Sequence, residues 1–413
     1  MLPTVPVQPI RLDDYREPAG DEAVDRLRKA AAPLEGARLL HLNSTAFGGG
    51  VAELLFTQVG LLQDLGIDVT WQVLEGSDDF FTVTKFVHNG LQGADVPWTE
   101  EMADVYLKRI RANAEEIADD YDFVFVHDPQ PVAVLACKED GGTRTGRWAW
   151  RCHIDVSAPD ADVWQFFAGY VNRFDGAVFT SQEYAQPNVT GPKVAIIPPS
   201  IDPLSPKNCP LEPATVDEVL HRYAIDRSRP TVTQVSRFDP WKDPIGVIDA
   251  FRLARAERPD LQLVMVGSMA HDDPEGWHYL QATQDHREND PDIHLLTNFQ
   301  EVGNLEVNAF QRASTVVLQK SIREGFGLTV AEAMWKERPV IGGRVGGIKL
   351  QIEDGASGFL VDSVEECARR IVELSDDRDL RDRIGHAGRE RVRQRFLTVR
   401  QLEDELRLLG SLS

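Results

Sequence analysis

Cysteine is scarce in this sequence, and the positions of the few present exclude two kinds of site. The 413 residues include four cysteines, Cys137, Cys152, Cys209 and Cys367. No two of them have the C-x-x-C spacing of a zinc knuckle or a thiol redox motif. Their scatter does not suggest the disulfide framework of a small secreted domain either. We therefore expect reduced and mostly buried thiols.

Long apolar runs are missing as well. No run approaches the roughly 20 apolar residues that a membrane-spanning helix needs. The first residues, MLPTVPVQPIRLDDYREPAG, lack the basic segment and apolar core of a secretory signal. We therefore expect a cytoplasmic protein without a membrane partner.

Positive charge is in short supply. The sequence has 44 Lys and Arg residues, of which 10 are Lys, against 66 Asp and Glu residues, and its formal net charge is -22. Nucleic acids and anionic membranes repel such a surface, so we expect neither as a partner. A local cationic site remains compatible with this balance.

Several common catalytic motifs have no counterpart here. The glycines Gly48, Gly49 and Gly50, in HLNSTAFGGGVAELL, stand between a predicted strand and a predicted helix, where backbone N–H groups can bind phosphate. Their spacing fits neither G-x-x-x-x-G-K-S/T nor G-x-G-x-x-G, so the P-loop and dinucleotide interpretations both fail. G-x-S-x-G is absent too, which removes the simplest serine hydrolase.

An alternation of strands and helices runs through the chain. A length of 413 residues suits two domains of roughly 200 residues with a cleft. Short apolar or β-branched runs followed by helical patterns predict the α/β class, with two doubly wound Rossmann-like domains facing that cleft. The predicted strands cover 38–43, 68–75, 123–128, 148–155, 177–181, 231–237, 261–267, 293–298, 315–319 and 339–343. The proline-rich stretch 198–215 predicts the interdomain linker.

Two carboxylates follow the strand predicted at 315–319. Gly325 and Gly327 permit a tight turn before the helical pattern LTVAEAMWK, whose first N–H groups would face the cleft. Glu324 lies in this turn and Glu332 lies eight residues later on the helix, so both can accept hydrogen bonds from one sugar-like ligand. For Glu332, a solvated helix carboxylate is the alternative.

Two cations follow the strand predicted at 231–237. Arg237 ends that strand and Lys242 comes five residues later, and open α/β sheets bind ligands at the carboxyl ends of their strands. A diphosphate suits the pair, because Arg binds phosphate oxygens bidentately and Lys adds a point charge. Surface ion pairs with Asp239 and Asp243 explain this segment equally well on its own.

Two histidines also end predicted strands. His127 and His153 each stand near an aspartate, Asp128 and Asp155, at the expected edge of the cleft. A single histidine at a strand end is more often a satisfied structural residue than a catalytic one. No spacing of His, Asp and Glu resembles a metal site, and the acidic stretch HDDPEGW at 271–277 is better explained as a polar loop.

Together these residues resemble the retaining GT-B glycosyltransferases of the glycogen-synthase-like superfamily. From about residue 38 to beyond 360 the chain is also similar to the trehalose glycosyltransferring synthases. This closer resemblance rests on HLNSTAFGGGVAELL, FFTVTKFVHNGLQG, VHDPQP, WRCHID, PPSIDPLS, QVSRFDPWK, MAHDDPEGW, VNAFQRAS and SIREGFGLTVAEAMWK. It implies a reversible transfer of glucose from NDP-glucose to free glucose with retention and without a metal or cofactor. The products are trehalose and NDP.

The resemblance also implies roles for individual residues. The catalytic set is Glu324, His153, Arg237 and Lys242. The donor site comprises Gly48, Gly49, Gly50, Arg237, Lys242, Glu324, Gly325, Phe326, Gly327, Leu328, Glu332, Gly346 and Gly347. The acceptor site comprises Lys85, His88, Asn89, His127, Asp128, Gln130 and Asp155. The acceptor domain is expected at 1–205 and the nucleotide-sugar domain at 206–384, with a helix at about 385–413 packing back on the first.

Several alternatives stay open at this stage. A trehalose phosphorylase of similar fold would use phosphate in place of a nucleotide. A transferase with another acceptor, such as a sugar phosphate, is a second alternative, although Lys85 without a cluster of Arg favours a neutral sugar. An inactive sugar-nucleotide sensor is a third. The sequence determines neither the nucleotide base, nor the physiological direction, nor whether the chain forms a homodimer.

Overall fold

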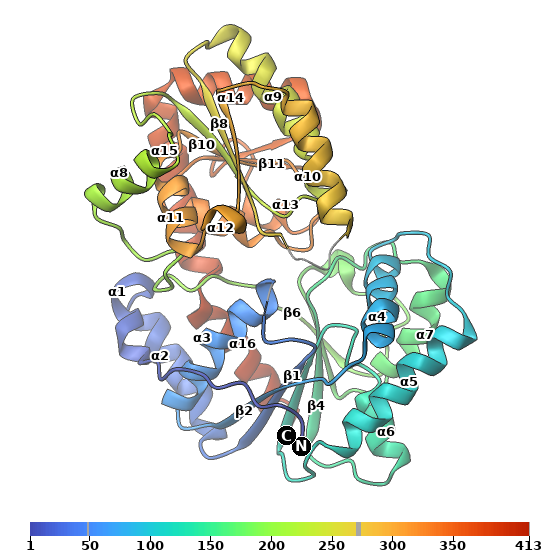
Figure 1. The fold of residues 1–413 in the computed structure, drawn as a ribbon. Helices are drawn as coiled ribbons and strands as arrows, with labels where there is room; N and C mark the ends of the chain where they lie inside the picture. The colour runs from blue at the N-terminus through green and yellow to red at the C-terminus, as the bar shows by residue number, and fades with distance from the viewer. Residues whose placement is uncertain (48, 270–273, 413) are drawn as a thin grey trace. The chain divides into compact units, whose positions relative to one another are not determined.

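Two parallel sheets organise the chain, each with helices on both faces (Figure 1). The computed structural model describes residues 1–47, 49–269 and 274–412. Its contacts divide the chain into a first unit, Met1–Ser200 with Thr398–Ser413, and a second unit, Ile201–Leu397.

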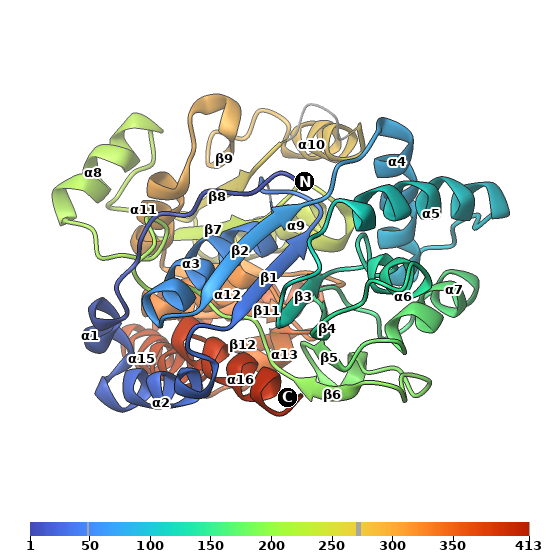
Figure 2. The same ribbon diagram turned by 90° about the horizontal axis from the view of Figure 1, so that it is seen from below.

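The first unit is built on a six-stranded sheet of order β2-β1-β3-β4-β5-β6. Its strands are β1 Arg38–Asn43, β2 Asp68–Val73, β3 Phe123–His127, β4 Arg147–Cys152, β5 Gly176–Phe179 and β6 Lys193–Ile196. Figure 2 shows the arrows of β2, β1 and β3 running in the same direction. The chain moves from β1 to β2 on one side and then places β3 on the other. The switch point therefore lies between β1 and β3, where open α/β sheets bind ligands.

The helices of the first unit divide between the two faces of this sheet. Helices α4 to α7 cover one face, and α3 and α16 lie on the other, with α16 packed against α2 (Figures 1 and 2). The helical segments are η1 Leu12–Tyr15, α1 Arg16–Ala19, α2 Asp21–Ala31, η2 Ala32–Leu34, α3 Gly50–Asp64, α4 Asp78–Leu91, α5 Glu100–Glu115, α6 Val134–Asp140, α7 Ala161–Val171, η3 Gln182–Tyr184 and α16 Thr398–Gly410.

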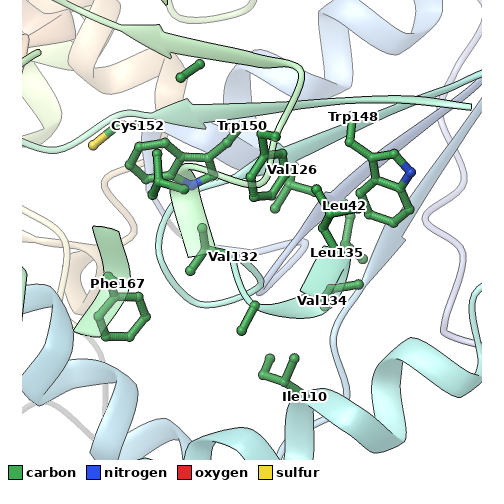
Figure 3. Packing of buried hydrophobic residues seen from close by; sticks show 14 of the residues in the cluster. Leu42, Ile110, Val126, Val132, Val134, Leu135, Trp148, Trp150, Cys152 and Phe167 are labelled. Carbon is green, nitrogen blue, oxygen red and sulfur yellow. The ribbon is translucent and has the colours of Figure 1, made fainter. Parts of the chain in front are cut away.

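The alternation of side chains along β4 fixes which residues face which layer. Trp148, Trp150 and Cys152 point to the side of α5, α6 and α7, where they pack with Ile110 and Phe167 in the core (Figure 3). Their neighbours in sequence point to the opposite face, because successive side chains of a strand alternate. The candidate residues His127 and His153 lie on that opposite face.

A buried ion pair ties the end of the chain to the first unit. Arg151 Nη1 donates to Glu405 Oε1 of α16 at 2.6 Å, and both side chains are buried. Gln401 Nε2 also donates to Glu405 Oε1, at 2.8 Å, and Ser200 Oγ donates to Gln401 Oε1, at 2.7 Å. Burial raises the pKa of Glu405 and lowers the pKa of Arg151, while each charge opposes the other's shift. The last helix is thus held by a paired polar cluster inside an apolar layer.

The second unit repeats the doubly wound plan. Its sheet has the order β12-β11-β10-β7-β8-β9, so its switch point lies between β7 and β10. The strands are β7 Thr231–Val235, β8 Gln262–Gly267, β9 Ile293–Thr297, β10 Val316–Gln319, β11 Val340–Gly343 and β12 Phe359–Val361. The helical segments are α8 Pro213–Arg222, η4 Pro240–Lys242, α9 Pro244–Glu257, α10 Pro274–Arg287, η5 Asn298–Gln300, α11 Asn304–Ala313, α12 Leu328–Trp335, α13 Ile348–Gln351, α14 Val364–Asp376 and α15 Arg378–Arg395.

Two apolar clusters fill the two faces of the second sheet. One joins Leu263 and Leu318 to Phe251 of α9 and Ile371 of α14. The other joins strand residues of the opposite face to α8 and α11. The α/β class with two doubly wound domains, expected from the alternating pattern, is what the structure has.

The unit boundaries differ from those expected. The second unit begins at Ile201 rather than at 206, because the connector packs on α11: Asn308 Nδ2 donates to the carbonyl oxygens of Pro206 and Cys209, both at 2.9 Å. The return to the first unit begins at Thr398 rather than near 385, since α15 belongs to the second unit. Among the helices that the structure describes, α16 is therefore the one that returns to the first unit.

Candidate functional site

The switch point of the second sheet brings the predicted cations and carboxylate together. The loop after β7 carries Arg237 and Lys242, and the loop after β10 carries Glu324. A backbone hydrogen bond joins the two loops: Ile322 N donates to Trp241 O at 2.9 Å. The guanidinium of Arg323 also lies over the Trp241 ring, 5.4 Å from its centroid. Adjacent strands in the sheet thus explain why residues about 80 positions apart meet.

Lys242 and Glu324 form an ion pair in this structure. Lys242 Nζ lies 2.6 Å from Glu324 Oε2, and the side chains are only 14% and 10% exposed. The same carboxylate oxygen accepts from Gln319 Nε2 at 3.1 Å and from Ser321 Oγ at 3.2 Å. Asp243, the other predicted surface partner, is instead paired with Lys320. Lys242 is therefore part of a polar cluster at the strand ends rather than a surface pair.

Arg237 remains at the surface. Its side chain is 64% exposed, and Nη2 lies 3.1 Å from Asp239 Oδ2. Asp239 is the partner that the sequence offered in the alternative explanation, but its side chain is only 8% exposed. The pair therefore joins a buried carboxylate to an exposed guanidinium, which is open to a phosphate on its solvent side.

The glycine-containing loop before α12 is held by a second glycine turn. Gly327, with φ 82°, occupies the left-handed region directly before α12. A Cβ at Gly347 would lie 2.4 Å from Phe326 Cα and 2.5 Å from Gly325 O, so only glycine fits there. Gly347 N donates to Glu324 O at 3.1 Å. Gly346 adopts a positive φ in the same turn, and Leu328 begins α12.

Glu332 has a separate environment. Its side chain is buried on α12, with Oε1 3.4 Å from Lys207 Nζ and Oε2 3.5 Å from Gln311 Nε2. Lys336, one turn later, donates to Asn208 Oδ1 at 2.8 Å, and burial lowers its pKa to about 7. Glu332 is thus not the solvated carboxylate of the alternative explanation, and its hydrogen-bond partners differ from those of Glu324.

The first unit carries a glycine loop at its own switch point. Gly49, with φ 89°, precedes α3, and Gly50 is the first residue of that helix. The first N–H groups of α3 have no partner within the helix and favour an anion. Gly48 lies outside the described residues.

A strained aspartate follows β3. Asp128 has φ 65°, a left-handed conformation that is unusual for a residue with a Cβ. Its Oδ1 accepts from His153 N at 2.9 Å, and burial raises its pKa to about 6. Gln130 lies half-buried two residues later, and Asp155 is buried, with Oδ1 accepting from Ser157 N at 2.9 Å. His153 and Asp128 therefore form one polar group at the ends of β4 and β3.

His127 lies deeper in the first unit than His153, to which it is hydrogen-bonded. Its ring is buried, with Nε2 2.9 Å from His41 Nδ1 and Nδ1 3.0 Å from His153 Nε2. Both ring nitrogens are occupied, so a ligand contacts His153 before it can contact His127. His41 was not among the candidates because it lies in the middle of a predicted strand, and only the register of β1 and β3 places it beside His127.

The remaining predicted acceptor residues lie on α4. Lys85, His88 and Asn89 are spaced by three and four residues, so they share one helix face. That face is exposed or half-exposed, whereas Phe80 and Val87 face the core.

The described residues contain neither a cluster of metal ligands nor a membrane-spanning helix. In residues 1–47, 49–269 and 274–412, no three His, Cys, Asp or Glu side chains come together as a metal site would require. The acidic stretch predicted as a polar loop at 271–277 lies partly outside the described residues. No helix in the same part of the chain is both long and apolar enough to cross a bilayer.

Lys207 and Lys320 are polar neighbours of the site that the sequence analysis does not single out. Lys207 lies in the proline-rich connector, and Lys320 directly follows β10. Lys320 could have been found from its place at a strand end, as Arg237 was. Lys207 carries no such signal, because only the folding of the connector onto the second unit brings it to Glu332.

Two family models match the chain. The model described as "Trehalose synthase, N-terminal domain" matches residues 41–186, and the model "Glycosyl transferases group 1" matches residues 217–391. The first therefore covers most of the first sheet and the second covers most of the second unit.

Curated relatives match over nearly the whole chain. Trehalose synthases of Thermococcus litoralis and Rubrobacter xylanophilus are each 48% identical to it, with 97% of this chain and 97% of each relative covered. A trehalose phosphorylase of Pleurotus pulmonarius is 29% identical, with 84% of this chain but 54% of that protein covered.

Solved structures share the architecture. The α,α-trehalose-phosphate synthase (UDP-forming) of Burkholderia xenovorans in complex with glucose-6-phosphate has a TM-score of 0.74, 14% identity, and coverage of 91% of this chain and 100% of that one. Sucrose-phosphate synthase of Thermosynechococcus elongatus has a TM-score of 0.68, 18% identity, and coverage of 91% and 100%. At such identities the likeness shows the fold, which is GT-B.

Proposed function

The chain belongs to the trehalose synthase family of GT-B glycosyltransferases, and on that premise we propose that it forms trehalose from NDP-glucose and free glucose. The proposed reaction retains the configuration of the transferred glucose, runs in both directions, and uses no metal or cofactor. The observation that carries the proposal is the Lys242–Glu324 pair at the β7/β10 switch point, with the exposed Arg237 in the same loop as Lys242.

The donor is proposed to bind to the second unit. Its diphosphate is matched by Arg237 and Lys242, by the N-terminal N–H groups of α12 and by the turn at Gly346–Gly347. Glu324, already an acceptor of several hydrogen bonds, is suited to accept further ones from sugar hydroxyls. Glu332 is proposed to bind the ribose, which requires the Lys207 side chain to move aside.

The acceptor glucose is proposed to bind to the first unit. Asp128 supplies a carboxylate on a strained, fixed backbone, and Gln130 supplies an amide. Lys85, His88 and Asn89 of α4 add donors and an amide on one helix face. His153 is proposed to contact the transferred glucose.

The bond changes need no enzyme nucleophile. The bond between the anomeric carbon and the phosphate oxygen breaks, and negative charge develops on the diphosphate, where Arg237 and Lys242 stabilise it. The anomeric hydroxyl oxygen of the acceptor bonds to the same face of the anomeric carbon. Its proton passes to an oxygen of the leaving phosphate, so atoms and charges balance without a glycosyl-enzyme.

A trehalose phosphorylase is the second candidate. The observation that favours it is the 29% identity to a trehalose phosphorylase of Pleurotus pulmonarius. The higher identity to synthases, over nearly their full length, favours the nucleotide. The two candidates differ in product, because trehalose is cleaved to NDP-glucose in one case and to glucose 1-phosphate in the other.

The proposal is tested by mixing the protein with glucose and, separately, UDP-, ADP-, GDP- and TDP-glucose. We expect α,α-trehalose and one equivalent of NDP with at least one donor, at an unchanged rate after exhaustive treatment with a chelator. Inversion at the anomeric carbon would contradict the proposed retention of configuration. A rate that is lost with the chelator and restored by added Mg²⁺ would contradict the proposed metal independence. Transfer to glucose 6-phosphate but not to glucose would identify another acceptor.

A further inference from the structure

Three histidines form a hydrogen-bonded chain through the first unit. His41 Nδ1 lies 2.9 Å from His127 Nε2, and His127 Nδ1 lies 3.0 Å from His153 Nε2. Their rings are nearly parallel, with interplanar angles of 24° at both contacts. We call His41, His127 and His153 the histidine chain.

Strand register explains this arrangement. His41 of β1 pairs in register with Phe125 of β3, two residues before His127, and His127 pairs with Arg151 of β4, two residues before His153. Steps of two keep all three side chains on one face of the sheet. The histidine chain therefore runs diagonally, from a buried position inside β1 to the half-buried edge after β4.

All three imidazoles are uncharged near neutral pH. Burial lowers the pKa of His41 to about 3 and lowers the pKa values of His127 and His153 well below their ordinary range. The cationic Arg151 on the same face acts on each ring in the same direction.

With three uncharged rings, the histidine chain has only two possible arrangements of its N–H protons. Each neutral imidazole has one N–H and one bare nitrogen, and each hydrogen bond needs one of each. His127 uses both nitrogens, so it donates to one neighbour and accepts from the other. The protons therefore lie on Nδ1 of all three rings or on Nε2 of all three.

The environment of His41, the buried end of the histidine chain, distinguishes these two arrangements. His41 Nε2 is enclosed and has no hydrogen-bond partner among the residues that the structure describes. Protons on Nε2 would leave a buried N–H donor unsatisfied there, and orphaned buried N–H groups are rare. Protons on Nδ1 leave only a bare nitrogen inside. They also leave an N–H at the outer end, on Nδ1 of His153, a residue that is half-buried rather than buried.

We propose that the histidine chain fixes His153 as an uncharged hydrogen-bond donor that presents its Nδ1–H to a sugar hydroxyl oxygen. His41 and His127 are then positioning residues: His41 fixes the direction of donation by His127, and His127 fixes the ring of His153. This inference rests on the proposed function in that the hydroxyl belongs to the transferred glucose.

The proposal limits the chemistry of His153. In this arrangement His153 Nδ1 has no lone pair in the ring plane, so it cannot take the proton of the acceptor hydroxyl. Making it a base would require the protons of all three rings to move to Nε2. His153 therefore binds and orients the sugar, and the proton of the acceptor passes to the leaving phosphate.

Nitrogen NMR of the intact chain labelled with ¹⁵N-histidine tests the proton positions directly. Side-chain signals are assigned by their loss in the single variants His41→Leu, His127→Leu and His153→Leu. We expect neutral rings with the proton on Nδ1 for all three, although free histidine prefers Nε2. A proton on Nε2 of His153, or a charged ring at neutral pH, would overturn the proposal.

Kinetics of two matched variants test the role of His127. Asn can place an amide N–H near the position of Nδ1 and donate to His153, whereas Leu has a similar size without a donor. Both changes remove the link to His41. We expect kcat/KM for the nucleotide sugar to fall about tenfold in His127→Leu and to stay within about threefold of wild type in His127→Asn. Equal losses in both variants would contradict the positioning role.

The two experiments separate the inference from the proposed function. If the chain makes no trehalose but the rings carry their protons on Nδ1, the histidine chain stands and the sugar assignment fails. If trehalose forms while His153 carries its proton on Nε2, the proposed function stands and this inference fails.

Discussion

Lys242 Nζ lies 2.6 Å from Glu324 Oε2, so the cation after β7 and the carboxylate after β10 form one ion pair. The pair offsets the negative charge of Glu324 where a diphosphate is proposed to bind. It also keeps the ammonium from lying along the surface. The second unit thus combines the largely buried cation of Lys242 with the exposed cation of Arg237.

The carboxylate of Glu324 is expected to matter for rate but not as a nucleophile. Glu324→Gln keeps the size of the side chain but removes the charge that pairs with Lys242. We expect kcat to fall by about 100-fold, as when one preorganised electrostatic contact is lost. Intact-protein mass spectrometry after rapid quenching should show no added glucose, whereas detection of a glucosylated protein would refute the direct route. Glu257→Gln, on the exposed end of α9, is the matched control and should keep the wild-type rate.

Arg237 is expected to hold the nucleotide through its phosphates. Arg237→Ala should weaken NDP binding by roughly tenfold to 100-fold, because a charge-assisted hydrogen bond contributes about 1.5–3 kcal/mol. Isothermal titration calorimetry measures this directly. Arg378→Ala removes an equally cationic but 82% exposed side chain of α15 and should leave the affinity unchanged. Equal affinities for the wild type and Arg237→Ala would remove Arg237 from the site.

The pH dependence of acceptor use should report Asp128. The pKa of its carboxyl is raised to about 6, so the carboxylate form that can accept a hydrogen bond from glucose prevails above that pH. We expect kcat/KM for glucose to fall as pH drops below about 6.

Asp128→Asn should lower kcat/KM for glucose and abolish its fall below about pH 6. The control Asp95→Asn, at an exposed position after α4, should keep that fall. The forward reaction is the one to measure, because the diphosphate of a nucleotide sugar lacks the terminal phosphate that ionises near pH 6. If kcat/KM of Asp128→Asn falls below pH 6 as in the wild type, another group than Asp128 is responsible for the fall.

The Arg151–Glu405 pair makes a separate prediction for stability. Glu405→Leu leaves the buried Arg151 cation uncompensated and should cost about 3–5 kcal/mol of unfolding free energy. Arg151→Met should cost a similar amount, while the double variant should recover most of the loss. Urea unfolding of the four proteins measures the coupling. Additive losses in the double variant would show that the two charges do not depend on each other.

Much of the fold follows from the sequence because strands in doubly wound sheets are buried on both faces. Runs such as RLLHLN and FVFVHD are apolar enough to stand out, and they become β1 and β3. The missed strands lack this signal: β6 is largely exposed and β12 has only three residues. The unit boundaries were displaced because helical periodicity does not tell which sheet a helix packs on, as α15 and α16 illustrate.

The candidate site was predictable where a charged residue ends a strand. Arg237, Lys242 and Glu324 follow β7 and β10, and parallel topology brings such strand ends together. His41 and Lys207 were not predictable, because their neighbours depend on strand register and on the folding of the connector. Of the two surface partners that the sequence left open, Asp239 pairs with Arg237 and Asp243 pairs with Lys320, while Lys242 pairs with Glu324.

Cleavage of trehalose in the presence of a co-substrate tests the proposed function most directly. The protein is incubated with trehalose and either UDP, ADP, GDP and TDP in turn or inorganic phosphate, and the sugar products are identified by mass and by NMR. We expect glucose and an NDP-glucose with at least one nucleotide, and no product with phosphate. Glucose 1-phosphate formed with phosphate, and no NDP-glucose with any nucleotide, would contradict the proposed function and identify a phosphorylase.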